Sequence, residues 1–269
     1  MTHDEILRIV EQHWDREVQV GCGYTVPALT LSRELVEEYV TGKRDELPGI
    51  EDAMEPRHLL AGVKGKRLLC LASGGGQQSV VFGLLGAYVI VLDLCAGQLR
   101  ADRVAAQHYG YELRTVKGDA SDLSVFADAS FDLVYQAPSM GWIPDVRAVY
   151  RGVHRVLRPS GLYRVALANP AVLLTEWDGI GYRIAGPYKG GPVLRNAAGV
   201  ENMEEGELTS DHRHLFCDSI GGLLELGFII RYVAEGPRRL REPVIGEPGS
   251  WTHAQHFLGV EIDVVAERV

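Results

Sequence analysis

The sequence lacks the features that mark a membrane, secreted or metal-cluster protein. No stretch approaches the ~20 apolar residues needed to cross a bilayer, and the N-terminal segment has no apolar run behind a basic region. The four cysteines (Cys22, Cys70, Cys95 and Cys217) show no C-x-x-C spacing, which argues against a zinc cluster. We therefore expect a cytoplasmic protein with free thiols and no membrane partner.

Basic residues are also scarce and scattered along the chain. The formal net charge is −9, and no run of Lys and Arg forms a face that could neutralise phosphates. The short cluster of Arg238, Arg239 and Arg241 is typical of a solvated loop. We expect no nucleic-acid partner, and an acidic protein instead suits a neutral or cationic ligand.

The middle of the chain alternates apolar runs of strand length with helical segments. The predicted strands cover residues 67–72, 88–93, 113–116, 131–135 and 162–167. The predicted helices cover residues 79–86, 99–109 and 145–157, and a turn is expected over 158–161. Continuous apolar strands separated by helices are typical of a parallel sheet that is covered on both faces. The pattern therefore predicts a doubly wound α/β fold.

The flanking regions give weaker patterns. Residues 1–64 read as helices and loops, with a helix over 31–40 capped by Thr30 or Ser32 and a short helix opened by Pro56. Residues 171–212 contain many Gly and Glu residues and little periodicity, which favours a structureless lid or binding loop. Beyond them, we expect a helix over 220–226 and strands over 228–233 and 257–265.

The sharpest local motif is the glycine-rich segment Ala72-Ser-Gly-Gly-Gly-Gln-Gln-Ser79, between a predicted strand and a predicted helix. Glycines let the backbone turn tightly and lie against a ligand, and the start of the following helix presents free N–H groups to an acidic ligand group. Asp93 ends the next strand, where a carboxylate can accept hydrogen bonds from both hydroxyls of a ribose. Together these features indicate a cofactor that contains a nucleoside.

Common nucleotide motifs do not fit this segment. A dinucleotide fingerprint needs Gly where Ser79 stands, and a nucleoside-triphosphate loop needs Lys where Gln77 follows the last Gly. Tyr39 and Lys43 have the Tyr-x-x-x-Lys spacing of short-chain dehydrogenases, but they precede the glycine segment instead of following it. A nicotinamide enzyme is therefore disfavoured, although a test against NAD remains useful.

Several segments resemble, in order, the motifs of class I S-adenosylmethionine-dependent methyltransferases that act on small molecules. They correspond to motif I, the acidic end of strand two, the adenine-binding turn, strand four, the helix and turn before strand five, and the helix entering strand six. These segments are residues 68–79, 92–94, 117–120, 130–135, 150–161 and 223–228. The resemblance covers residues 66–170 well and 215–267 more loosely.

This resemblance implies both a fold and a domain organisation. The expected fold is a Rossmann-like, seven-stranded sheet, mostly parallel with an antiparallel last strand. It implies an S-adenosylmethionine-binding core over residues 65–269, with a lid insertion at about 171–212. Residues 1–64 would form a helical N-terminal cap.

The resemblance also assigns cofactor contacts position by position. Residues 73–78 would face the methionine part of the cofactor, Asp93 the ribose, and Asp119 with Ala120 the adenine. The full predicted cofactor set is Tyr24, Ala72, Ser73, Gly74, Gly75, Gly76, Gln77, Gln78, Asp93, Leu94, Gln98, Gly118, Asp119, Ala120, Gln136, Ala137 and Pro138. Ser139 and Trp142 would border the substrate. The hydroxyl of Tyr24 would reach the cofactor carboxylate.

Two positions depart from the family pattern, which often has an acidic residue where Cys70 stands and Gly where Ala72 stands. Loss of that carboxylate leaves recognition of the cofactor ammonium group more dependent on backbone carbonyls and on the two glutamines, Gln77 and Gln78.

Candidate general bases are His212 and His214, from the segment Asp211-His-Arg-His214, together with Tyr24. The alternative for the two histidines is a solvated helix start with Ser210 or Asp211 as its N-cap. A metal site is not expected, because no third ligand has suitable spacing. His253 and His256 are expected in a loop and at a strand end.

The implied reaction is in-line transfer of a methyl group to a nitrogen, sulfur or oxygen nucleophile of a small molecule. The protein would align the nucleophile, the methyl carbon and the sulfur, and exclude water. Two alternatives remain open at this point. One is intramolecular cyclisation of S-adenosylmethionine on the same fold, and the other is a non-catalytic S-adenosylmethionine-binding protein.

Overall fold

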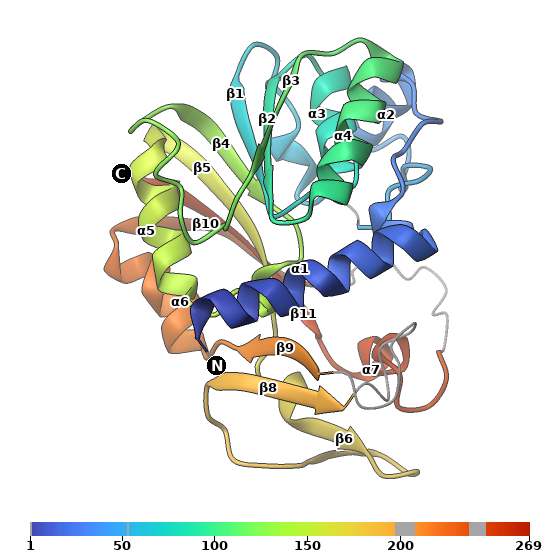
Figure 1. The fold of residues 1–269 in the computed structure, drawn as a ribbon, viewed down its shortest axis with the longest axis vertical. Coiled ribbons are helices and arrows are strands. Elements are labelled where there is room, and N and C mark those ends of the chain that lie inside the picture. The colour runs from blue at the N-terminus through green and yellow to red at the C-terminus, as the bar shows by residue number, and fades with distance from the viewer. Residues whose placement is uncertain (1, 53, 197–207, 237–245) are drawn as a thin grey trace.

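The computed structural model describes residues 2–52, 54–196, 208–236 and 246–269. Its centre is a seven-stranded sheet in the order β10-β11-β5-β4-β1-β2-β3 (Figure 1). The strands are β1 (Arg67–Leu71), β2 (Tyr88–Asp93), β3 (Leu113–Lys117), β4 (Phe131–Gln136), β5 (Leu157–Ala168), β10 (Phe228–Gly236) and β11 (Glu261–Arg268). Strands β1 to β5 run parallel, and β11 is antiparallel to both β5 and β10. The predicted sheet, mostly parallel with an antiparallel last strand, is confirmed.

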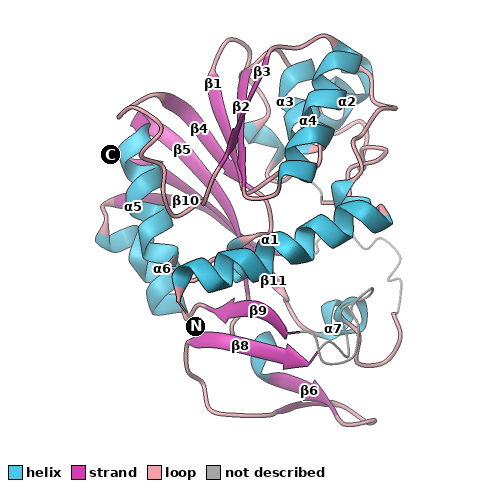
Figure 2. Cartoon of the chain, viewed as in Figure 1, coloured by secondary structure: helices cyan, strands magenta, loops and turns pink. Residues whose placement is uncertain are grey.

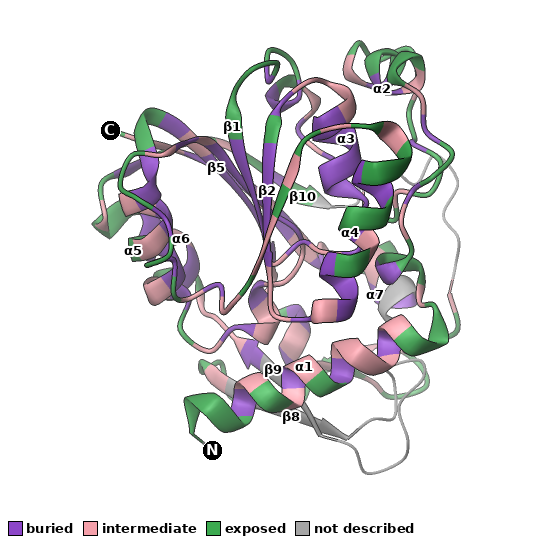
Figure 3. Cartoon of the chain, turned by 45° about the horizontal axis from the view of Figure 1, so that its top comes forward, coloured by how far each residue is buried: buried purple, intermediate pink, exposed green. Residues whose placement is uncertain are grey.

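Helices cover both faces of this sheet (Figure 2). One side carries α2 (Arg33–Val40), α3 (Gln78–Leu84) and α4 (Ala96–Tyr109), and the other carries α5 (Val146–Val156) and α6 (Phe216–Glu225). Side chains of β1 alternate between the two cores, with Leu68 in one and Leu69 in the other. A strand buried on both faces must be apolar at successive positions. Figure 3 shows this burial along the central strands.

The helix α1 (His3–Val20) runs from side to side below the central sheet in the view of Figure 1. A capping box starts it, because Thr2 accepts a hydrogen bond from Glu5 N at 3.3 Å while the Glu5 carboxylate accepts one from Thr2 N at 2.7 Å. Gly21 ends it in the left-handed region, with φ of 70°.

Most predicted elements are present with shifted ends. Helix α4 begins at Ala96, three residues before the expected start, and β5 includes the expected turn over 158–161. Ser32 caps α2 by accepting from Leu35 N at 3.3 Å. Pro56 precedes the three-residue helix η2 (Arg57–Leu59) instead of opening it.

The expectation of a structureless lid over residues 171–212 is wrong for its described part. After the short helix η4 (Val172–Leu174), strand β6 (Thr175–Trp177) pairs with β7 (Tyr182–Ile184). Strand β8 (Gly191–Asn196) pairs with β9 (Leu208–Arg213). In antiparallel strands the backbone hydrogen bonds are made with a separate segment of the chain. The weak periodicity within each short segment therefore did not indicate these strands. Residues 197–207 and the arginine cluster Arg238, Arg239 and Arg241 lie outside the described residues.

Two further elements correct the sequence interpretation. Helix α7 (Trp251–Phe257), capped by Ser250, replaces the start of the expected strand over 257–265, so His253 and His256 lie on a helix. Ser210 and Asp211 belong to β9 and cap no helix, since α6 begins at Phe216. In the part of the chain that the structure describes, no helix combines the length and apolar character needed to span a membrane.

Candidate active site

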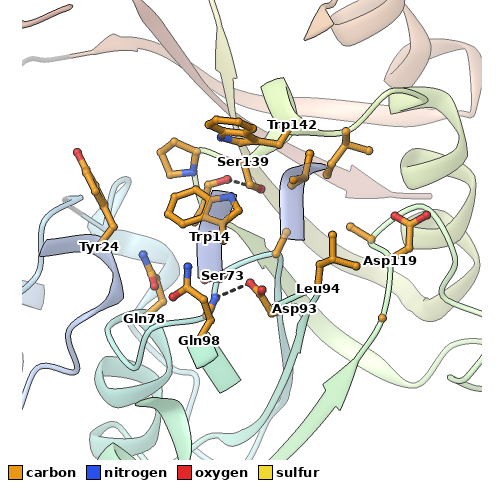
Figure 4. Close-up of a pocket in the computed structure, with 18 of the residues that line it drawn as sticks. Trp14, Tyr24, Ser73, Gln78, Asp93, Leu94, Gln98, Asp119, Ser139 and Trp142 are labelled. Atoms are coloured by element: carbon orange, nitrogen blue, oxygen red, sulfur yellow. Dashed lines mark hydrogen bonds between the residues drawn. The ribbon is translucent and has the colours of Figure 1, made fainter. Parts of the chain in front are cut away.

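A pocket opens where the loops after β1, β2, β3 and β4 meet α1 (Figure 4). Its volume, including the opening to solvent, is about 820 Å³. Because the carboxyl ends of parallel strands share one edge of the sheet, residues far apart in sequence converge here. Of the predicted positions, the lining includes Tyr24, Ala72, Ser73, Gly74, Gln77, Gln78, Asp93, Leu94, Gln98, Gly118, Asp119, Ala120, Ala137, Pro138, Ser139 and Trp142.

Another part of the pocket wall comes from residues that sequence reasoning missed. Leu7, Val10 and Trp14 line the pocket from α1, and Asp52 and Ile143 join them from loops. The spacing of three and four residues places the α1 side chains on one face of the helix, so periodicity contained a signal for them. No local pattern marks Asp52 or Ile143.

Aromatic rings form one side of the pocket. The ring centroids of Trp14 and Trp142 lie 5.8 Å apart in an edge-to-face arrangement. His13, on the same helix as Trp14, stacks on Trp142 with a centroid separation of 4.7 Å. The three rings fix α1 against the loop after β4, since such contacts add to simple burial.

The backbone N–H groups of three successive glycines are bonded within the protein. Gly74 N donates to Asp93 Oδ2 at 3.0 Å, and Gly75 N donates to the carbonyl of Gln98 at 3.2 Å. Gly76 N donates to Asp102 Oδ1 at 3.1 Å. A phosphate-binding loop instead points such groups at its ligand. The segment is therefore tied to the end of β2 and to α4, and is not arranged to receive a pyrophosphate.

Three predicted cofactor residues do not line the pocket. Gly75 and Gly76 have φ of 99° and 74°, and a Cβ on Gly75 would stand 2.4 Å from the carbonyl oxygen of Tyr24. These glycines permit close packing between the N-terminal segment and α4. The Gln136 side chain is fully buried, accepting a hydrogen bond from Tyr163 OH at 2.5 Å and donating to Ser139 Oγ at 3.1 Å.

The pocket wall includes buried polar atoms without an internal partner. Ser73 Oγ and Gln98 Oε1 have no hydrogen-bond partner among the described residues, and both side chains are at least nine-tenths buried. Asp93 lines the same pocket (Figure 4), with Oδ1 accepting from Cys95 N at 2.9 Å. Burial raises the pKa of Asp93 to about 6. Buried polar atoms normally have partners, so this part of the wall is suited to a polar ligand.

Asp119 is held by two neighbours. Its Oδ1 accepts from Ser121 N at 2.9 Å, and its Oδ2 lies 2.7 Å from Nε2 of His3. A second contact from α1 is the ion pair of Glu11 with Lys117, at 2.6 Å. Helix α1 is therefore attached to the end of β3 beside the pocket.

Charge in the pocket has one sign. Among the described residues, the lining includes the carboxylates of Asp52, Asp93 and Asp119 and no Lys, Arg or His side chain. Tyr24 stands at one end (Figure 4), and burial, followed by the charges of Asp52 and Glu261, raises its pKa. Its hydroxyl is thus protonated at neutral pH and can donate a hydrogen bond.

The two candidate histidine bases do not line the pocket. His214 Nε2 donates to the carbonyl oxygens of Ile143 at 2.9 Å and Met140 at 3.2 Å, and burial lowers the pKa of the ring. The ring of His212 stacks on that of His214, with centroids 6.2 Å apart. Both side chains pack behind the loop after β4, because β9 runs there in place of the expected helix start.

Comparison with known proteins agrees with this geometry. A family model described as a methyltransferase domain matches residues 69–165. The uncharacterized methyltransferase YbaJ of Bacillus subtilis is 33% identical over 223 residues, which cover 81% of this chain and 85% of that protein. The ubiquinone biosynthesis O-methyltransferase of Pseudomonas syringae pv. tomato is 29% identical over 45% of this chain and 53% of its own length.

Solved structures show the same architecture. An S-adenosylmethionine-dependent methyltransferase from Mesorhizobium loti has a TM-score of 0.64 and 24% identity, covering 79% of this chain and 95% of that chain. In layered α/β folds, a pocket at the carboxyl edge of the sheet is the usual place for a nucleoside-containing cofactor, which is typical of cofactor-dependent enzymes. This chain belongs to the class I S-adenosylmethionine-dependent methyltransferases, and S-adenosylmethionine is the cofactor of that family.

Proposed function

We propose that this enzyme transfers the methyl group of S-adenosylmethionine to a nitrogen, sulfur or oxygen atom of a small molecule by in-line displacement. The observation that carries the proposal is the single pocket in which Asp93, Asp119, the glycine segment and the aromatic pair Trp14–Trp142 meet. The ubiquinone biosynthesis relative, by its name, acts on a small molecule.

The residues present fit the cofactor. The unpartnered atoms Ser73 Oγ and Gln98 Oε1 offer buried hydrogen-bonding positions in the pocket wall. Gly74 lets Gln98 and Asp93 pack directly against the glycine segment, since a Cβ there would stand 2.5 Å from Gln98 Cβ and 3.0 Å from Asp93 Oδ2. The described lining has carboxylates and no basic side chain, which suits a cationic sulfonium better than a pyrophosphate.

We assign the holding roles as follows. Asp93 keeps acceptor positions beyond its two backbone bonds and would hold the ribose hydroxyls. Asp119 and the backbone of Ala120 would hold the adenine edge, with Asp119 oriented by His3 and Ser121. Tyr24 would donate to the cofactor carboxylate. Ser73, Gln77 and Gln78 would lie along the methionine part.

When bound, S-adenosylmethionine supplies a methyl group already activated by the positive sulfur. The protein therefore has to orient the acceptor and exclude water. Leu7, Val10 and Ile143 make the wall apolar beside the aromatic pair, while Trp142, Ser139 and Asp52 bound the region left for the acceptor. No histidine lines the pocket, so this assignment uses no histidine base.

Calorimetric titration of the purified protein with S-adenosylmethionine, S-adenosylhomocysteine and NAD tests the proposal. We expect micromolar binding of both sulfur nucleosides, no binding of NAD, and at least about tenfold weaker binding in Asp93→Asn, in line with losing a charged acceptor. Glu112→Gln, an exposed change of the same charge, is the control. Absence of binding by either sulfur nucleoside would overturn the proposal.

Product analysis then separates the reaction types. Incubation with S-adenosylmethionine and a panel of amines, thiols and phenols should yield S-adenosylhomocysteine and a methylated acceptor. Methylthioadenosine as the product would instead identify intramolecular cyclisation. Binding without turnover of any panel member would favour a non-catalytic protein.

A further inference from the structure

A second carboxylate lies behind the glycine segment, outside the pocket lining. Asp102 of α4 is fully buried, and its Oδ1 accepts hydrogen bonds from Gly76 N at 3.1 Å and from Ser79 Oγ at 2.5 Å. The same segment is held at its other end by Asp93, through Gly74 N. Two carboxylates therefore hold the two ends of one three-glycine turn.

No cationic side chain of the described residues forms an ion pair with the buried Asp102 carboxylate. Its Oδ2 has no hydrogen-bond partner among the described residues. The titratable and hydroxyl groups that face it are Ser79 of α3, Tyr111 after α4, Cys70 of β1 and Asp93 of β2. Burial, together with the smaller effect of the Asp93 charge, raises the pKa of Asp102 to about 7 against the hydrogen bonds that lower it. A buried carboxylate without a cation is costly to stability.

Hydrogen bonding alone does not require this charge. An asparagine at position 102 has a carbonyl oxygen that can accept from the same Gly76 N–H and Ser79 hydroxyl. Asparagine lacks the negative charge of Asp102. That charge acts on the pocket across the glycine segment, which is shielded from water, and electrostatic interactions are stronger there than in solvent. The nearby pocket lining is acidic, and the part of it that the structure describes contains no basic side chain that would cancel this field.

We propose that Asp102 is a specificity-determining residue that, together with Asp93, makes the pocket favour positively charged S-adenosylmethionine over neutral S-adenosylhomocysteine. The inference rests on the proposed function, because it needs the sulfur nucleosides to bind in this pocket. The two ligands share their adenosine, amino and carboxylate groups and differ in the methyl group and the sulfonium charge. The field of Asp102 therefore weakens retention of the product relative to the cofactor.

Calorimetric affinities of both ligands for the wild-type enzyme, Asp102→Asn and the control Glu112→Gln test this inference without any turnover. We expect Asp102→Asn to bind S-adenosylmethionine about tenfold more weakly and to keep its S-adenosylhomocysteine affinity within about threefold, the sign of a charge effect. Ser79→Ala removes a hydrogen bond that lowers the pKa of Asp102, so at neutral pH it should weaken S-adenosylmethionine binding in the same direction as Asp102→Asn.

The pH dependence of the wild-type enzyme supplies a second readout that a purely structural role would not move. The ratio of the two affinities should rise between pH 6 and pH 8, as Asp102 ionises, and this rise should be smaller in Asp102→Asn, which retains Asp93. Equal weakening of both ligands in Asp102→Asn, or a pH profile unchanged by the substitution, would overturn the inference alone. Failure of the wild-type enzyme to bind either ligand would overturn the proposed function instead.

Discussion

Nε2 of His3 lies 2.7 Å from Oδ2 of Asp119, a residue 116 positions further along the chain. The contact joins the first turn of α1 to the loop after β3, at the position assigned to the adenine. Together with the ion pair of Glu11 and Lys117, it makes the N-terminal helix part of the pocket wall.

Removal of the His3 ring should loosen this wall. In His3→Ala, we expect faster amide exchange along α1 and a fall in S-adenosylhomocysteine affinity of about two- to fivefold, the scale of a partly exposed ion pair. Hydrogen exchange by mass spectrometry and calorimetry measure the two effects. Gln12→Ala, an exposed change on the same helix, is the control. Unchanged exchange in α1 would contradict the role given to His3.

His214 should act as a structural residue. In His214→Phe, the carbonyl group of Ile143 loses its His214 donor and that of Met140 keeps only the bond from Ile143 N, so the free energy of unfolding should fall by about 1–3 kcal/mol. The pH profile of methyl transfer should keep its shape, because the ring does not line the pocket. Denaturant unfolding and rate measurements test this, with the exposed His256→Phe as the control. Loss of one limb of the pH profile would restore the general-base hypothesis.

Asp102→Asn should stabilise the protein at alkaline pH. The pKa of Asp102 is raised from 3.8 to about 7 by folding, so the unfolded chain ionises first and wild-type stability falls as pH rises from about 4 to about 7. Asparagine does not ionise, so the stability of the variant does not fall over this pH range. We expect its Tm to exceed that of the wild type by about 3 °C or more at pH 8, and by less at pH 5. A gain that is equal at both pH values would contradict a buried charge at position 102.

Ala72 should tolerate replacement by glycine. Its φ of 44° lies in the left-handed region, which costs a residue with a Cβ about 1–2 kcal/mol, more than the flexibility penalty of glycine. We expect Ala72→Gly to raise the free energy of unfolding by about 0.5–1 kcal/mol. Ala101→Gly, in the interior of α4, should lower it by about 1 kcal/mol. Denaturant midpoints compare the two, and a loss of stability in Ala72→Gly would show that the local backbone is not strained.

The sheet was predictable because each central strand is buried on both faces. Segments such as 88–93 are apolar at almost every position, and their spacing with helices admits few arrangements. The glycine segment and Asp93 were located for the same reason, since they directly follow such strands. The hairpins β6–β7 and β8–β9 depend on pairing between separate segments, and the sequence around them has no strong period.

The pocket was predictable only on the side made by the loops of the sheet. Trp14 and Val10 come from a helix whose amphipathic spacing marks a buried face without saying what that face covers. Asp102 occupies a helix position where burial, not sequence pattern, determines its chemistry. His212 and His214 attracted attention by residue type, but their strand places them behind the loop after β4.

The meeting of Trp14 with Trp142 also has a consequence for folding. Trp14 lies on the helix that borders the pocket, and its aromatic partner Trp142 is made well over a hundred residues later. Contacts between segments so distant in sequence form late, because the intervening chain must first be ordered. A nascent chain can therefore complete β1 to β3 before the pocket exists. Ligand binding during folding therefore indicates that α1 has packed against the loop after β4, and not only that the sheet has formed.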